Sequence, residues 1–65
     1  MDQIRKLISE REELEAEEFL IEETILLSPI NEEDERRLRE QLTDIRAKIA
    51  NVNWYLIKLY AEVTQ

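Results

Sequence analysis

Residues 38–63 read LREQLTDIRAKIANVNWYLIKLYAEV, and their aliphatic side chains recur at alternating steps of four and three. This spacing places the aliphatic side chains on one stripe of an α-helix, and such a stripe must be buried against another helix. The stripe consists of Leu38, Leu42, Ile45, Ile49, Val52, Leu56, Leu59 and Val63. The chain has 65 residues, which leaves room for one other long helix to cover it. The stretch therefore predicts an all-α fold made of two helices.

A short segment with the sequence SPIN, residues 28–31, interrupts the helical pattern that precedes it. Pro29 has no backbone N–H and disfavours the helical conformation at Ser28. We therefore expect the first helix to cover about residues 2–27. The chain contains no glycine, the residue that turns most often need, so this segment is the only turn that we expect.

The second helix is expected over about residues 32–63. Asn31 is a preferred N-cap residue, and the acidic residues that follow it suit the positive end of the helix dipole. The alternative is that Ser28 caps this helix and Pro29 takes its first position. Either start gives a single antiparallel helical-hairpin domain over residues 1–65, with its turn at about 28–31.

Folding the chain back about this turn sets which side chains of the two helices face each other. The apolar layers are then expected between residues at equal distances from the turn. These layers pair Ile21 with Leu38, Leu14 with Ile45, and Leu7 with Val52.

More apolar side chains are present than two helices can bury between them. Exposed apolar patches of this kind mark interaction surfaces, and a common solution is a symmetric dimer that forms a four-helix bundle. We expect the hairpin to form such a homodimer. The expected partner or dimer interface consists of Ala47, Ala50, Trp54, Ile57, Ala61, Ile8, Phe19 and Leu26.

The chain carries a formal net charge of −7. This balance argues against direct binding to nucleic acid, because neutralising phosphates requires clustered Lys and Arg, and against binding to anionic membranes. The sequence also lacks an apolar run of the ~20 residues that span a bilayer, and its beginning lacks a signal-peptide layout. We expect a cytoplasmic protein.

The negative charge is concentrated in the first helix. Residues 10–23 contain an acidic patch of eight glutamates: Glu10, Glu12, Glu13, Glu15, Glu17, Glu18, Glu22 and Glu23. Arg11 and Glu18 are unusual because they take core-facing heptad positions, where charges often set register or oligomeric state. We expect Arg11 to pair with Glu15 or Glu18 of its own chain, or with Glu18 of a twofold mate.

The sequence does not indicate an enzyme. It has no His, no Cys and no glycine-rich phosphate loop, so we expect no catalytic residues and no cofactor. Glu15 and Glu18 have the spacing of carboxylates in bundle metal sites, but the histidines that complete such di-iron sites are missing. We therefore expect no metal site and no small-molecule ligand.

The composition and pattern favour a non-enzymatic protein–protein interaction module: a small acidic helical-hairpin regulator or assembly factor that acts as a homodimer and binds another protein. The alternative is an acidic inhibitor or decoy of phage or plasmid type, which imitates nucleic acid and blocks a basic target protein. A third hypothesis is a subunit of a larger helical assembly. Salt separates the first two, because an acidic decoy loses affinity as ionic strength rises while an apolar interface does not.

Overall fold

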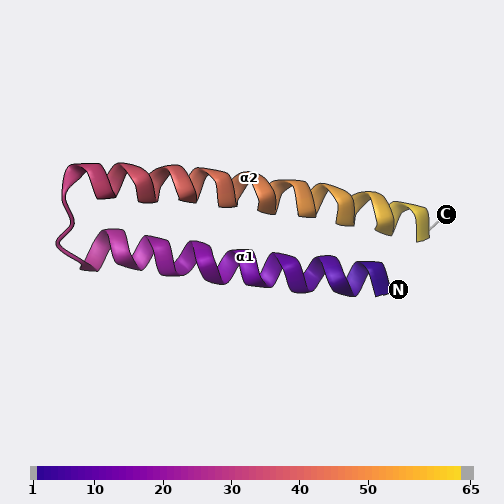
Figure 1. Cartoon of the computed structure of the whole chain (residues 1–65). Coiled ribbons are helices and arrows are strands. Elements are labelled where there is room, and N and C mark those ends of the chain that lie inside the picture. Colours follow the sequence, from indigo (N-terminus) through magenta and orange to yellow (C-terminus); the bar gives the residue numbers. More distant parts are fainter. Residues whose placement is uncertain (1, 64–65) are drawn as a thin grey trace.

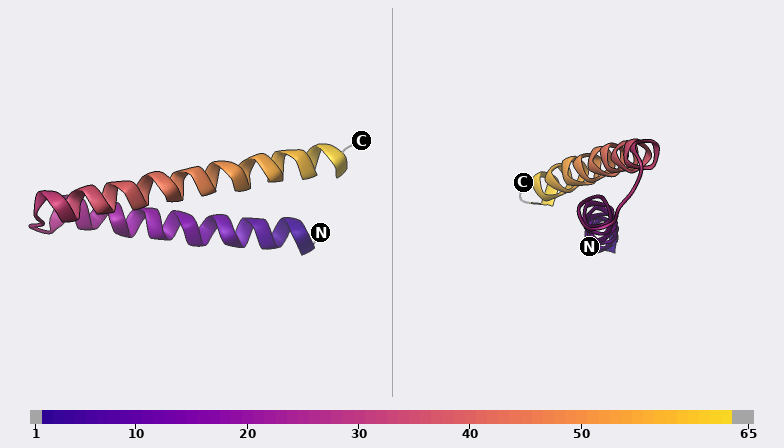
Figure 2. Two further views of the ribbon diagram at one scale, coloured as in Figure 1. Left: turned by 45° about the horizontal axis from the view of Figure 1, so that its top comes forward. Right: turned by 90° about the vertical axis from the view of Figure 1, so that its left-hand side faces the viewer.

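The computed structural model describes residues 2–63 as two long helices joined by a short connection (Figure 1). Helix α1 covers Asp2–Leu27 and helix α2 covers Glu32–Val63. The helices lie antiparallel and side by side, as the further views in Figure 2 also show, and they form a rod of 51 × 14 × 13 Å. Residues 2–63 contain no strand. The predicted all-α helical hairpin is therefore confirmed.

The connection has the hydrogen bonds of a helix end followed by a capped helix start. The N–H of Ser28 donates to the carbonyl oxygen of Thr24 at 3.1 Å, which closes the last turn of α1 before Pro29. The Asn31 side chain then accepts a hydrogen bond at its Oδ1 from the N–H of Asp34 at 2.8 Å. Its carbonyl oxygen accepts from the N–H of Glu35 at 3.0 Å. Asn31, and not Ser28, is thus the N-cap of α2.

The core is a single line of side chains from α2 against α1. Its buried residues are Leu42, Ile45, Val52 and Leu56, and Leu56 is only 3% exposed. Among the described residues, α1 has none that is buried to this degree. Its seam side chains are half-buried: Ile4, Leu7, Leu14, Ile21 and Ile25. Because two helices touch only along one line, the flanks of both helices remain open to water.

Two side-chain contacts between the helices join residues further along α2 than equal distances from the turn would place them. Residues at equal distances from the turn would place Arg11 opposite position 48 and Glu18 opposite position 41. Instead, Arg11 bonds to Asn53 and Glu18 pairs with Arg46, each five positions further along α2. Side chains tilt toward the N-terminus of their own helix, so in an antiparallel pair each one meets a partner further along the other helix.

The residues that border the open grooves between the helices can be compared with the expected apolar layers. Leu7 borders a groove together with Val52, as the expected layer of these two residues requires, and Leu14 borders the same groove. Ile21 borders a groove with Ile45, while the expected layers of Ile21 with Leu38 and of Leu14 with Ile45 stay predictions. Val63 is 65% exposed although it belongs to the predicted stripe, because it lies in the last turn of the longer helix α2. The last turn of α2 extends beyond the beginning of α1 in Figure 1, where α1 offers no residue to cover it.

Neither helix offers a membrane-spanning stretch. Within residues 2–63, no part of α1 or α2 is both long enough and apolar enough to cross a bilayer.

Candidate interaction surface

One side of the hairpin carries a cluster of ion pairs that joins the two helices. The guanidinium of Arg46 donates from Nε to Oε2 of Glu18 at 3.0 Å and from Nη2 to Oε1 of Glu22 at 2.9 Å. Glu18 and Glu22 lie one helical turn apart, so one arginine reaches both carboxylates. The hydrogen bonds to Glu18 and then to Glu22 raise the pKa of Arg46 above its ordinary value. We call these three residues the ion-pair cluster.

Arg11 lies on the same side of the hairpin. It donates from Nη1 to Oδ1 of Asn53 at 3.1 Å, and its Nε lies 3.9 Å from Oε1 of Glu15. Of the partners expected for Arg11, Glu15 is therefore correct, while Glu18 pairs with α2. Arg11 and Glu18 are both half-buried at the edge of the seam. The sequence reasoning missed the α2 partners of these two charges, because choosing them required the register.

Five residues of the predicted interface lie on this same side. Phe19 borders a shallow depression together with Glu22 and Arg46. By helical spacing, Leu26 lies two turns from Phe19 on the same line of α1, and Ile8 shares a line with Glu15 and Glu22. Ala50 and Ile57 follow Arg46 at steps of four and seven along α2. We call this set the apolar face: Ile8, Phe19, Leu26, Ala50 and Ile57.

The side chains of the apolar face are largely in contact with solvent. Phe19 is 60% exposed and Ile57 is 68% exposed, while Ile8 is half-buried. Two large apolar side chains on the same side of two neighbouring helices are seldom this exposed, unless the surface binds a partner.

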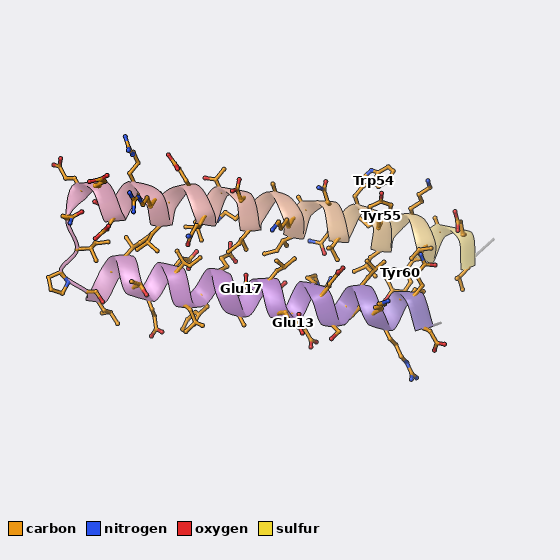
Figure 3. All side chains as sticks on the ribbon, in the orientation of Figure 1. Glu13, Glu17, Trp54, Tyr55 and Tyr60 are labelled. Carbon is orange, nitrogen blue, oxygen red and sulfur yellow. The ribbon has the colours of Figure 1, made fainter. Side chains whose placement is uncertain are left out.

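The other three predicted interface residues, Ala47, Trp54 and Ala61, are also exposed but lie further round α2. In Figure 3, Trp54 points away from α1. Its ring lies 5.6 Å from that of Tyr55 in an edge-to-face arrangement, and Nζ of Lys58 lies 5.4 Å from the Trp54 ring centre. The predicted interface therefore spans the apolar face and the outer side of α2.

The opposite side of the hairpin has two open grooves between the helices, each of about 440 Å³. Glu17 and Lys48 border both, so the two grooves form one channel along the hairpin. Apolar side chains of both helices line it, and the carboxylates of Glu10 and Glu13 also border it. We call this channel the acidic groove.

The eight glutamates of the predicted acidic patch do not share one face. Glu15, Glu18 and Glu22 lie beside Arg46, and Glu10, Glu13 and Glu17 border the acidic groove. The remaining two, Glu12 and Glu23, are exposed at helical positions that point away from α2. Within residues 2–63, no group of three or more His, Cys, Asp or Glu side chains is arranged to hold a metal ion.

No known family, curated protein or solved structure matches this chain. The hairpin thus has two candidate surfaces: an apolar face with an ion-pair cluster on one side, and an acidic groove on the other.

Proposed function

We propose that this chain is a non-enzymatic protein–protein interaction module, a small regulator or assembly factor that works as a homodimer. Two hairpins pack through their apolar faces, with the adjoining outer side of α2 that carries Trp54 as part of the contact, and form a four-helix bundle. The observation that carries the proposal is the exposure of Phe19 and Ile57, which come from different helices. Phe19 borders a depression with Arg46, and helical spacing from Arg46 places Ile57 on the same side of the hairpin.

The total accessible surface of the chain is larger than that of a compact monomer, which supports a binding partner for the hairpin. The accessible surface is 5468 Å² for a mass of 7.9 kDa, whereas a compact monomer of this mass exposes about 4,400 Å². The excess of about 1,000 Å² is comparable to the ~800 Å² that each partner buries in a standard interface. A second copy of the chain covers an area of this size.

Charge favours the apolar face as the place where two copies meet. Arg11 and Arg46 offset most of the charge of Glu15, Glu18 and Glu22 on that side, and both arginines are within ion-pair distance of these carboxylates. The acidic groove has four bordering carboxylates, those of Glu10, Glu13, Glu17 and Asp44, against the single Lys48. Because each copy carries a net charge of −7, repulsion between copies is weaker through the apolar face.

The test is the mass of the purified chain by sedimentation equilibrium from about 1 µM to about 1 mM. We expect twice the 7.9 kDa of one chain at the upper end. The variant Phe19→Glu with Ile57→Glu should remain helical and become monomeric. The control Leu20→Glu with Leu27→Glu adds the same charge at exposed positions outside the apolar face and should remain dimeric. A wild-type chain that stays monomeric throughout contradicts the proposal.

The acidic-decoy alternative has less support. Two carboxylates of the acidic stretch, those of Glu18 and Glu22, are bound by Arg46, and the rest are divided between several sides of α1. A phosphate-like surface requires its charges on one face.

A further inference from the structure

We propose that the acidic groove docks a basic amphipathic helix from a partner protein. This inference goes beyond self-association, because the groove lies on the side of the hairpin opposite the apolar face and remains open when two copies meet there.

The shape of the groove suits a helix. It runs between two antiparallel helices from the level of Leu7 to that of Ile21. Fourteen residues of helix correspond to about 21 Å, or about four turns. A third helix laid between two packed helices completes a three-helix bundle with the usual packing of side chains into grooves.

The lining of the groove supplies an apolar stripe for such a helix. Leu7, Leu14 and Val52 lie along it, and Tyr55 forms part of its wall. Leu7 and Leu14 are half-buried by α2 alone, and Tyr55 is exposed, so an added helix has apolar surface to cover. A peptide with apolar residues at helical spacing fits this stripe.

The carboxylates along the edge of the groove favour a positively charged partner helix. Glu10, Glu13 and Glu17 follow one another at helical spacing along one edge. Within residues 2–63, no ion pair or side-chain hydrogen bond engages these three carboxylates, whereas Glu15, Glu18 and Glu22 each pair with an arginine. Lys48 borders the groove without forming an ion pair to them. Lysine or arginine side chains of a docked helix pair with this rim.

The experiment uses a fluorescently labelled 14-residue peptide of leucine and lysine with leucine at helical spacing, and measures binding by anisotropy at about 0.15 M salt. The groove variant is Glu10→Gln, Glu13→Gln and Glu17→Gln. The control is Glu12→Gln, Glu23→Gln and Glu40→Gln, which removes the same charge at exposed positions outside the groove. We expect the groove variant to weaken binding by about tenfold or more and the control by less than about threefold.

A scrambled peptide of the same composition tests the apolar stripe and should bind at least about tenfold more weakly. Shifts of the methyl resonances of Leu7, Leu14 and Val52 on peptide addition, without shifts at Ile57, support docking in the groove. Equal losses in the two variants, equal binding of the scrambled peptide, or no binding at all overturn the proposal. The mass of both variants is measured in parallel, so a failure of docking is distinguished from a failure of dimerisation.

Discussion

Arg46 in α2 donates from Nε to Oε2 of Glu18 in α1 at 3.0 Å, and this contact links the two helices across the edge of their seam. The same guanidinium reaches Glu22 at 2.9 Å. Two bonds from one planar group fix its position along α1 better than a single bond does. The contact therefore marks the register in which the two apolar stripes meet.

Replacing Arg46 should cost a small amount of stability, because the side chain is mostly exposed and such pairs are weakened by solvent. We expect Arg46→Gln to lower the thermal midpoint, and the difference from wild type to shrink at about 1 M salt. The control is Arg36→Gln, an exposed arginine of α2 that forms no ion pair to α1. A salt-independent loss in Arg46→Gln contradicts an electrostatic role.

The effect of Arg46 should not depend on pH in the neutral to moderately alkaline range. Hydrogen bonds to Glu18 and Glu22 raise the pKa of Arg46 in the folded state. A raised pKa stabilises the fold at every pH below the pKa of the unfolded state, and this stabilisation is lost only as the pH rises through the folded-state pKa. The difference in thermal midpoint between wild type and Arg46→Gln should be the same at about pH 7 and about pH 9. A smaller difference at the higher pH contradicts the expected sign.

Substitutions at two adjacent residues of α2 should have different effects, one on folding and the other on association. Leu56 is buried against α1 at 3% exposure, so Leu56→Ala should lower the free energy of unfolding by about 2–5 kcal/mol. Ile57 lies on the apolar face, so Ile57→Ala should shift the mass of the chain toward the monomer with little loss of helix. Urea unfolding and sedimentation of both variants test the pair. Equal losses of unfolding free energy in dilute solution contradict the assignment of Ile57 to the surface.

Much of the fold follows from local chemistry that the sequence displays. The four buried residues, Leu42, Ile45, Val52 and Leu56, all belong to the stripe with alternating steps of four and three. Pro29 indicates where α1 ends. These features depend on the periodicity of one helix and on the conformation of one turn, and both can be evaluated without knowing how the helices meet.

The contacts of Arg11 and of the ion-pair cluster could not be predicted in the same way. The expected layers assumed equal distances from the turn, while Arg11 and Glu18 reach partners further along α2 because side chains tilt toward the N-terminus of their own helix. From the sequence, Arg46 is a surface cation next to the core residue Ile45. Only the packing of the two helices places it beside Glu18. The division of the glutamates between several sides of α1 has the same origin, since it depends on where α2 lies.

The N-cap offers a local test of the connection. The Asn31 side chain accepts the N–H of Asp34 at 2.8 Å, so Asn31→Ala should lower the free energy of unfolding by about 1 kcal/mol. Ser28→Ala is the control, because the structure gives Ser28 no capping role for α2 and only its backbone N–H bonds to Thr24. Urea unfolding of both variants measures the difference. A larger loss in Ser28→Ala would favour the alternative start of α2.

Trp54 should contribute to association more than to the helical content of one chain. Its ring is exposed and points away from α1, and the small Ala50 and Ala61 on the same broad side of α2 allow close approach of another helix. Because buried tryptophans are frequent hot spots, Trp54→Ala should weaken dimerisation by about tenfold or more, with unchanged circular dichroism per residue. Leu20→Ala is the control, since Leu20 is an exposed apolar residue that borders the acidic groove on the other side. Trp54 is the only tryptophan, so the emission of the wild-type chain should also shift to shorter wavelength as concentration rises. An emission maximum that does not change with concentration, together with the same mass for Trp54→Ala and wild type, would exclude Trp54 from the interface.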